Sequence, residues 1–480
     1  MTTTEDLERR KWLALMLLAA AQFVVVLDAS IVNVALPSIG QDLKIDNAEL
    51  SWVVNAYTLF FGGFLLLGGR MADLLGRRRV FMGGLILFAL ASLAGGLAQD
   101  EMQLIVARAV QGLGAAILSP AALSIVTTTF TEGAERNRAL GVWGAVAGSG
   151  GAAGVLLGGV LTDALSWEWV LFVNVPIGLA AAAVAPRLLA DTRDADRHRS
   201  FDAAGAVTIT AGLSILVYAL VDAEDAGWGS TQTVVLLSLA ALLLAAFAAI
   251  ERRERAPLVP FGVFRLRTLS ASNAIGVLIG MALFSMFFFV SLYMQNVLGF
   301  DALEAGLAYL PLALTIIVSA GVASQLVTRL GFKPVLMAGL LLVAGGLVGF
   351  SQVSPGGSYA ADVLVPSLLA GAGLGFSFVP VTIGAVAGTR DEESGLASGL
   401  INTSQQVGGA LGLAVLSTVA FAGVPDGGRP DPAALTAGFH DAFLVGAGFA
   451  LLAFVIATLA IRGEDSRAMK GAQAPAPAAA

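Results

Sequence analysis

The sequence predicts an all-α integral membrane protein whose chain crosses the bilayer fourteen times. Its 480 residues are 57% hydrophobic and only 13% charged, whereas soluble proteins average about 25% charged residues. The mean hydropathy is +0.83. Apolar stretches of about 20 residues, the length that a helix needs to span a bilayer, recur along the whole chain. These observations exclude a water-soluble globular protein.

The apolar stretches form three groups, separated by charged segments. The first six lie at 12–36, 50–70, 80–98, 102–126, 139–162 and 169–189, and two more lie at 203–221 and 232–250. The last six lie at 271–294, 304–327, 334–353, 360–387, 397–421 and 440–461. We therefore expect an N-terminal six-helix half (1–190), a linker with two inserted transmembrane helices and a cytoplasmic loop (191–264), a C-terminal six-helix half (265–462) and a disordered cytoplasmic tail (463–480).

The basic residues predict the orientation. With the N-terminus inside, only Lys44 and Arg429 fall in outside loops, and Arg108 lies within a span. Every other Lys and Arg then lies on the inside, as the positive-inside rule requires. The first stretch is longer than the apolar core of a signal peptide and no cleavage pattern follows it. We expect a multi-pass protein of the cell membrane with both termini in the cytoplasm.

Short motifs recur in the two expected halves. Ala139-Leu140-Gly141 precedes Gly150-Gly151 by the same distance as Ala397-Ser398-Gly399 precedes Gly408-Gly409. The loop around Arg77 has a weaker counterpart around Lys333, at nearly the same offset. Such internal symmetry is typical of transporters, and it indicates a duplicated six-span unit interrupted by the two inserted helices.

Residue counts exclude several kinds of chemistry. The chain has no cysteine and only two histidines, His198 and His440, so it has neither a thiolate nucleophile nor a Cys- or HExxH-type metal site. No lysine follows a glycine, so a Walker A loop is absent. The net charge of −7 argues against nucleic acid as a partner. We expect a protein that is not an enzyme and holds no metal.

Two charged residues, Asp28 and Arg108, lie well inside predicted spans rather than near their ends. At 1.5 Å per residue, Arg108 is about 9 Å from the outer end of the fourth span, and Asp28 likewise lies in the outer half of the first span. A charge in a span costs ~2.5–3.5 kcal/mol on insertion scales and usually has a partner, so these two could pair, with Gln111 on the same helix face as Arg108. The alternatives are an arginine that snorkels to the interface and a hydrogen-bonded structural carboxylate.

A basic loop follows the second span. It reads Gly69-Arg70-Met71-Ala72-Asp73-Leu74-Leu75-Gly76-Arg77-Arg78-Arg79. Its glycines permit close helix approach, and Asp73 can form ion pairs that close the cytoplasmic face. We expect gating by Gly69, Asp73, Gly76 and Arg77; a simple positive-inside anchor is the alternative.

Glycines at spacings of three and four run through the fifth span. Such strips allow two helix backbones to touch. We expect Gly144, Gly148, Gly154 and Gly158 to form a helix-packing surface. A generic tight helix pair would explain the run equally well.

Together these segments resemble the major facilitator superfamily, and specifically its fourteen-span drug:proton antiporter family. The resemblance rests on five ordered motifs: Leu27–Pro37 in span one, Gly69–Arg79 in the cytoplasmic loop, Arg108–Gly114 in span four, Gly144–Gly159 in span five and Ser166–Gly178 at the start of span six. The chain departs from the family pattern at Val155, where proline is usual, and at Glu168 and Ser30.

The resemblance implies a monomeric multidrug or antibiotic exporter that works by alternating access. Protons would drive it, and no cofactor beyond the proton gradient is implied. Asp28 and Arg108 match the residues implicated in proton coupling, which requires Asp28 to reach water in at least one conformation. We expect a cavity for a small lipophilic substrate that includes Asn33, Asn55, Tyr57 and Gln111. A permease, uniporter or importer without proton coupling is the alternative, and Val155 is the residue that favours it.

Overall fold

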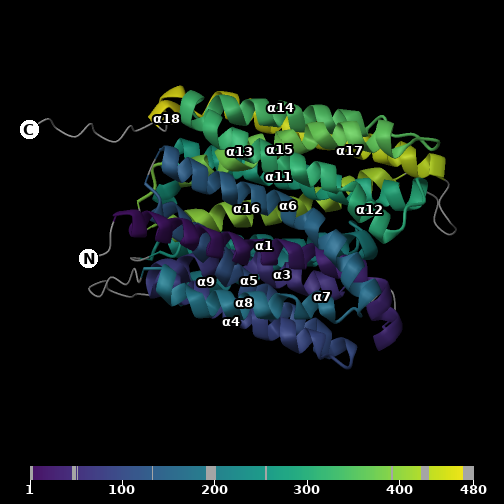
Figure 1. Cartoon of the computed structure of the whole chain (residues 1–480), viewed down its shortest axis with the longest axis horizontal. Helices are drawn as coiled ribbons and strands as arrows, with labels where there is room; N and C mark the ends of the chain where they lie inside the picture. Colours follow the sequence, from purple (N-terminus) through teal and green to yellow (C-terminus); the bar gives the residue numbers. More distant parts are fainter. Residues whose placement is uncertain are drawn as a thin grey trace, which may run out of the picture.

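The computed structural model describes residues 4–45, 50, 52–131, 133–190, 202–254, 257–390, 393–422 and 432–468. These residues are nearly all helical, and they include no strand. The long helices run side by side along one axis, and the start of α1 lies at the same end of the bundle as the short helix α18 (Figure 1). The predicted all-α fold class is confirmed.

Each predicted span corresponds to a helix or to two consecutive helical segments. The first six are α1 (Thr4–Leu43), α3 (Trp52–Leu75), α4 (Arg77–Gly96), α5 (Glu101–Thr129), α6 (Ala134–Ala164) and the pair α7 (Trp169–Phe172) and α8 (Asn174–Leu188). The inserted helices are α9 (Ala203–Ala226) and α10 (Thr231–Glu251). Local signals explain several boundaries. Asp100 caps α5 by accepting from the Gln103 backbone N–H, and Gly76 makes the turn between α3 and α4 with a φ of 97°, which glycine adopts without strain.

The rest of the chain begins with a short 3₁₀ turn, η1 (Phe261–Arg265). It continues with α11 (Arg267–Leu292), η2 (Tyr293–Val297), α12 (Ala302–Ala308), α13 (Leu310–Leu330), α14 (Phe332–Phe350), η3 (Tyr359–Leu364), α15 (Val365–Val386), α16 (Ser394–Phe421) and α17 (Pro432–Ala460). Both η2 and η3 are π-helical. They continue α11 and precede α15, so they belong to the ninth and twelfth predicted spans.

Among the described residues, thirteen helical segments are long and apolar enough to cross a membrane, and α6 is the fourteenth if its two parts form one span. It is bent by 43° between Gly151 and Ala153. Sharp bends in helices occur at proline or at runs of glycine and serine, and the run Gly148-Ser149-Gly150-Gly151 stands at the bend. Helix α6 therefore bends although Val155 replaces the proline that is usual in this motif.

The helices form two similarly packed sets. In the first, α1 packs on α6 and α8, while α3 and α4 pack on α5; in the second, α11 packs on α16 and α17, while α13 and α14 pack on α15. The sets meet where α3 contacts α16 and where α6 contacts α13. Figure 1 shows α6 and α16 in the middle of the bundle, where the two sets meet. The same pairing of equivalent helices is what a duplication would produce, and the domain boundaries stay predictions.

The inserted helices lie against one of these two seams. Helix α9 packs on α10 and also on both α3 and α16. Near its C-terminal end, Tyr218 stacks on Trp52 of the first set, and Trp228 Nε1 donates to Thr418 Oγ1 of the second set at 2.7 Å. The insert therefore touches both sets along the α3–α16 seam.

The expected disorder after residue 462 is wrong for the first six residues of the tail. Gly463–Ala468 form helix α18, because Ser466 has a partner there: its hydroxyl oxygen accepts from the Lys333 backbone N–H at the start of α14, at 2.9 Å. Ser466 is 3% exposed. The remainder of the expected tail, 469–480, lies outside the described residues.

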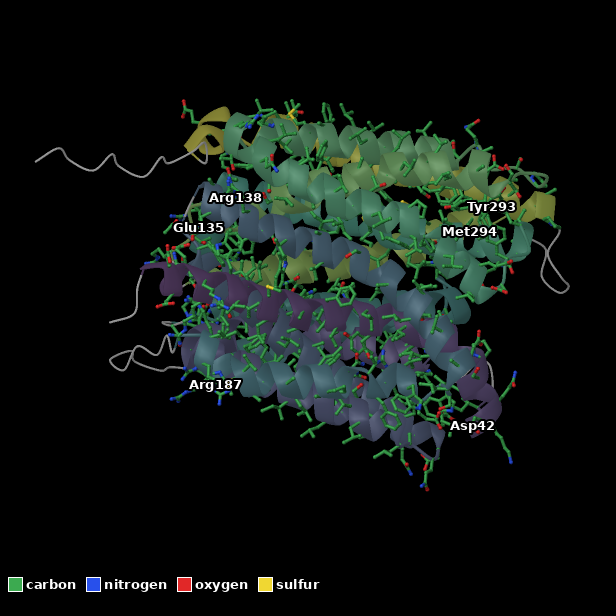
Figure 2. All side chains as sticks on the ribbon, in the orientation of Figure 1. Asp42, Glu135, Arg138, Arg187, Tyr293 and Met294 are labelled. Carbon is green, nitrogen blue, oxygen red and sulfur yellow. The ribbon has the colours of Figure 1, made fainter. Side chains whose placement is uncertain are left out.

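Basic side chains mark one end of the bundle. Figure 2 shows Arg138 and Arg187 at this end, and Asp42 and Tyr293 at the other. We name the end that holds Arg77, Arg138 and Arg187 the basic end, and the other the opposite end.

Candidate functional site

Asp28 lies near the middle of α1 and has no exposed surface. Its Oδ2 accepts from Arg108 Nη1 at 2.6 Å. Its Oδ1 accepts from Gln111 Nε2 at 2.8 Å and from Asn174 Nδ2 at 2.7 Å. The donors belong to α5 and α8, which both pack against α1. Three donors, one of them charged, stabilise a carboxylate in its ionised form.

Arg108 is also fully buried and contacts four groups. Besides Asp28, its Nη1 donates to Gln111 Oε1 at 2.8 Å, and its Nε donates to the Val53 carbonyl at 3.0 Å. The guanidinium lies 4.4 Å from the centre of the Tyr57 ring, a cation–π geometry. Arg108 Nη2 has no hydrogen-bond partner among the described residues. The guanidinium is thus held by α1, α3 and α5 together.

A second layer of polar side chains orients these donors. Ser92 Oγ in α4 accepts from Gln111 Nε2 and from Asn174 Nδ2, both at 3.0 Å. It donates to the Leu171 carbonyl in α7 at 2.8 Å. Sequence reasoning assigned no role to Ser92 or Asn174. A buried amide in an apolar span is a detectable signal for Asn174, but nothing in the sequence distinguishes Ser92 from other serines.

The structure decides between the interpretations of Arg108. Snorkelling is wrong, because the guanidinium turns inward to Asp28 and has no exposed surface. The pair is neutral overall, which limits the cost of placing two charges in a low-dielectric interior. Removing one partner of such a pair typically costs about 3–5 kcal/mol, because the other charge is then left buried and uncompensated.

The four residues expected in the substrate cavity do not lie together. Tyr57 and Gln111 are 1% and 0% exposed, and in this conformation both form part of the Asp28 network. Asn33 is exposed on α1 and donates only locally, to the Ala29 carbonyl at 3.3 Å. Asn55 is half-buried on α3. The common cavity wall formed by these four residues stays a prediction.

At the basic end, Asp73 joins the two sets of helices. Its Oδ1 and Oδ2 accept from the Gly395 and Leu396 backbone N–H groups, each at 3.0 Å. These groups lie at the N-terminus of α16, where unpaired N–H groups and the helix dipole favour a negative charge. Arg77 Nη2 lies 3.6 Å from Asp73 Oδ1. The residues expected to gate thus lie at a contact between the two sets.

Glycine makes this contact possible. A Cβ on Gly69 would collide with the Gly395 carbonyl oxygen, so only glycine lets α3 and α16 touch at this point. Two further polar contacts join the sets nearby: Ser124 and Ser394 hydroxyl oxygens are 2.8 Å apart, and Asn137 Nδ2 donates to Thr328 Oγ1 at 3.1 Å. In this conformation the basic end is closed.

The glycine run in α6 packs on two partners. A Cβ on Gly154 would come within 2.6 Å of the Leu27 carbonyl, and one on Gly158 within 2.8 Å of the Ile31 carbonyl, both in α1. Gly144 instead faces Val379 of α15, in the second set. The contacts of Gly148 lie outside the described residues. The run therefore holds α6 against the turns of α1 that flank Asp28.

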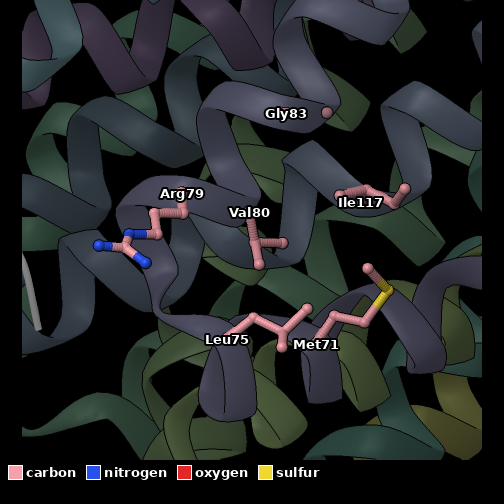
Figure 3. Close-up of a pocket in the computed structure, with 7 residues that line it drawn as sticks. Met71, Leu75, Arg79, Val80, Gly83 and Ile117 are labelled. Atoms are coloured by element: carbon pink, nitrogen blue, oxygen red, sulfur yellow. The ribbon is translucent and has the colours of Figure 1, made fainter. Parts of the chain in front are cut away.

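A separate cavity of about 380 Å³ lies near the basic end of the first set (Figure 3). Its mostly apolar lining comes from α3, α4 and α5 and includes Met71, Leu75, Val80 and Ile117. It shares no residue with the Asp28 network, and neither α1 nor the second set contributes to it. This cavity is therefore not a chamber between the two sets of helices.

The fold has two six-helix sets that contact each other along two seams, and an ion pair is buried inside the first set. This arrangement is typical of secondary transporters. The chain belongs to the Major Facilitator Superfamily, which its residues 18–413 match. It is therefore a multi-pass membrane protein of a transporter family and not an enzyme.

Two relatives cover almost the whole chain. The puromycin resistance protein pur8 of Streptomyces alboniger is 42% identical over 95% of this chain and 92% of its own length. The cephamycin export protein CmcT of Amycolatopsis lactamdurans is 43% identical over 93% of this chain and 91% of its own length. Among solved structures, the human organic anion transporter MFSD10 superposes with a TM-score of 0.66 at 15% identity, covering 94% of this chain and 99% of that one. This last similarity concerns the fold alone.

Proposed function

We propose that this chain exports small lipophilic drugs or antibiotics from the cytoplasm in exchange for protons. Relatives that are 36–43% identical are named for puromycin resistance, cephamycin export, and tetracenomycin C resistance and export. The basic end faces the cytoplasm, in agreement with the positive-inside rule. Both termini then lie in the cytoplasm, and the protein works as a monomer in the cell membrane.

The observation that carries proton coupling is the sealed contact between Asp28 and Arg108. A proton on Asp28 would convert charge-assisted hydrogen bonds into weaker neutral ones and leave the Arg108 charge buried without its counter-ion. The contacts of Asp28 with Arg108, Gln111 and Asn174 therefore favour the ionised form of Asp28. Protonation shifts the population towards a conformation in which α1 and α5 are arranged differently.

Proton access requires that second conformation. Asp28 has no exposed surface here, so a proton reaches it only after the helices around it move. The basic end is closed by the contacts of Asp73 and Ser124 with α16, so the proton enters from the opposite end. Ala29 and Asn33 of the same helix are already exposed, but they lie about 100° and 140° around α1 from Asp28, so α5 and α8 must move away from α1 to admit water to Asp28.

Substrate binding is assigned to the space between the two sets when the basic end opens. Asn33 and Asn55 are the expected cavity residues that keep exposed surface. Apolar walls with few fixed polar partners suit a range of lipophilic compounds, because contact area rather than matched hydrogen bonds then provides affinity.

Inverted membrane vesicles with an acidic lumen test this proposal, with puromycin as the probe. Each proton exchanged supports about tenfold accumulation per unit of pH difference, so vesicles with the parent protein should accumulate puromycin against its gradient. Asp28→Asn should abolish accumulation, whereas Asp222→Asn, which alters a carboxylate at the opposite end, should not. Uphill accumulation that persists in Asp28→Asn would remove Asp28 from coupling.

A uniporter is the second candidate, and Val155 in the span-five motif favours it. A uniporter equilibrates puromycin whether or not a pH gradient exists. Adding nigericin, which collapses the pH gradient, separates the two: an antiporter loses its accumulated puromycin, and a uniporter shows the same flux before and after.

A further inference from the structure

The two inserted helices meet at the basic end in a pair of buried carboxyl groups. Asp202 caps α9, its Oδ1 accepting from the Gly205 backbone N–H at 2.7 Å, and Glu251 is the last residue of α10. They are 8% and 4% exposed. Asp202 Oδ2 and Glu251 Oε1 both lie within 2.6 Å of the position that a Cβ on Gly205 would take, and the two side chains are within hydrogen-bonding reach of each other.

One oxygen of this pair lacks a donor. Asp202 Oδ2 is buried and has no hydrogen-bond partner among the described residues, although it lies beside Glu251. Two buried carboxylates in contact cannot both be ionised, and such pairs hold one proton in common. With one shared proton, Asp202 Oδ2 and the Glu251 carboxylate form a hydrogen bond with each other.

No described basic group compensates a second negative charge at this site. The elements packed around it contribute apolar side chains, among them Leu66 of α3, Phe247 of α10 and Leu396 of α16. On the same segment as Glu251, the side chains of Arg252 and Arg253 are exposed. Arg70 of α3 binds the neighbouring loop instead: its Nη2 donates to the Pro257 carbonyl at 3.3 Å.

Glu251 also holds the loop that follows α10. Its two carboxylate oxygens accept from the Leu258 and Val259 backbone N–H groups at 3.2 and 3.1 Å. Leu258 and Val259 are each 2% exposed, and they belong to the same buried cluster as Leu66 and Leu396. The position of this loop, named here the latch loop (residues 257–259), therefore depends on Glu251.

The latch loop lies at the gate contact. Arg70, which donates to the loop, stands three residues before Asp73 on α3, and Asp73 accepts from the N-terminus of α16. Leu396, whose N–H donates to Asp73, packs in the same cluster as the latch loop. The inserted helices, α3 and α16 thus meet at one place at the basic end.

We propose that Asp202 and Glu251 bind one proton between them, and that this proton fastens the latch loop over the closed gate at the basic end. Loss of the proton at higher pH places two negative charges in contact, releases the latch loop and lowers the population of the closed gate. The proposal rests on the proposed function only in taking this gate to open during transport. It assigns to the insert a proton site that is separate from Asp28.

A disulfide between Ser124→Cys and Ser394→Cys reports the closed gate. The two hydroxyl oxygens are 2.8 Å apart across the seam, and the chain has no other cysteine. Purified protein carrying this pair is oxidised between about pH 6 and pH 8, which brackets the range where a coupled carboxyl pair can titrate. Thiols react faster at high pH in every variant. The disulfide yield at each pH is therefore divided by the yield of the same cysteine pair carrying Glu251→Gln.

Glu251→Gln keeps one acceptor for the latch loop and supplies a permanent donor to Asp202. At pH 6 the disulfide yield of the parent cysteine pair should equal that of Glu251→Gln. At pH 8 the parent yield should be lower by about threefold or more, because the repulsion of two charges in contact opposes closure. Asp202→Asn should behave like Glu251→Gln, since Asn also caps helices and its amide donates to Glu251. Glu254→Gln, which changes an exposed carboxyl group three residues away, should behave like the parent.

The measurement is repeated with Asp28→Asn to separate the two proton sites. If the parent and both amide variants change in parallel with pH, the pair does not control the gate. If the pH effect disappears with Asp28→Asn alone, it belongs to Asp28, and the proposal fails while proton-coupled export stands. A pH-dependent difference from Glu251→Gln that survives Asp28→Asn and is absent in Asp202→Asn supports the proposal, whatever the outcome of the puromycin assay.

Discussion

Arg108 links α1, α3 and α5 within the Asp28 network. It contacts Asp28 of α1, Val53 and Tyr57 of α3, and Gln111 of its own helix. The planar guanidinium can point several donors in fixed directions, which the single ammonium group of lysine cannot do. The arginine at this position therefore sets the relative placement of α1, α3 and α5.

Removing the charge of Arg108 should destabilise the protein, and removing both charges should restore much of that stability. Arg108→Gln leaves Asp28 buried and ionised without a counter-ion, so we expect a loss of about 3–5 kcal/mol in unfolding free energy. The double variant Asp28→Asn/Arg108→Gln should recover most of it while remaining inactive in puromycin transport. Thermal unfolding in detergent measures the stability of each variant. If the losses of the two single variants simply added in the double variant, the pairing of Asp28 with Arg108 would be contradicted.

Asn174 should matter more for stability than an exposed asparagine of the same half. Its side chain donates to both Asp28 and Ser92, so Asn174→Ala leaves two buried acceptors short of a donor, at a cost of about 1–3 kcal/mol. Asn33→Ala is the matched control, because Asn33 is exposed and bonds only within its own helix. Equal unfolding temperatures for these two variants would show that the Asn174 bonds are not formed.

At the scale of elements, the contact between α1 and α6 positions Asp28. The α6 glycines pack directly on the backbone of α1 at Leu27 and Ile31, on either side of Asp28. Close backbone packing without side chains between helices is what spaced glycines permit. The placement of Asp28 relative to α5 and α8 thus depends on the width of the α1–α6 contact.

Gly154→Ala should separate α1 from α6. The added methyl group would come within 2.6 Å of the Leu27 carbonyl and would also meet Ser30 Oγ, and overpacking of this kind costs about 1–3 kcal/mol. Gly151→Ala is the control in the same helix, because its Cβ would have no neighbour within 4 Å. Thermal unfolding and puromycin transport should both fall for Gly154→Ala relative to Gly151→Ala, and the opposite order would contradict the packing described.

At the scale of the whole molecule, the two sets of helices are joined at the basic end by a small number of polar contacts. Asp73, Ser124 and Asn137 each bond across the seams. Because these bonds are few and directional, they can break and form again as the two sets rock against each other.

Asp73→Asn should open the basic end. The amide has one acceptor oxygen instead of two, so one of the Gly395 and Leu396 N–H groups loses its partner, and the favourable interaction with the α16 dipole is lost. We expect the disulfide yield of the Ser124→Cys/Ser394→Cys pair to fall about fivefold or more. Asp222→Asn, at the opposite end, should leave the yield unchanged, and an unchanged yield in Asp73→Asn would mean that other contacts close the gate.

Sequence patterns sufficed for the topology and for part of the site. Each of the fourteen predicted spans corresponds to helical segments of the structure, because the bilayer requirement for about 20 apolar residues is local and can be read from any one stretch. Asp28 and Arg108 were recognisable for the same reason: a charge within an apolar span needs a partner. The direction of Gln111 followed from helix geometry alone.

The tertiary structure alone decided which groups meet. Asn174 and Ser92 complete the Asp28 network only because α5, α7 and α8 pack on α1 and α4 packs on α5, α7 and α8, and no local pattern contains that arrangement. Burial of Tyr57 and Gln111, and the contact of Asp202 with Glu251, likewise depend on residues that are distant in sequence. Composition and periodicity determined that this chain spans a membrane and how many times, since hydrophobic length is a property of single segments. Packing decided where its charges lie, since pairing is a property of several segments at once.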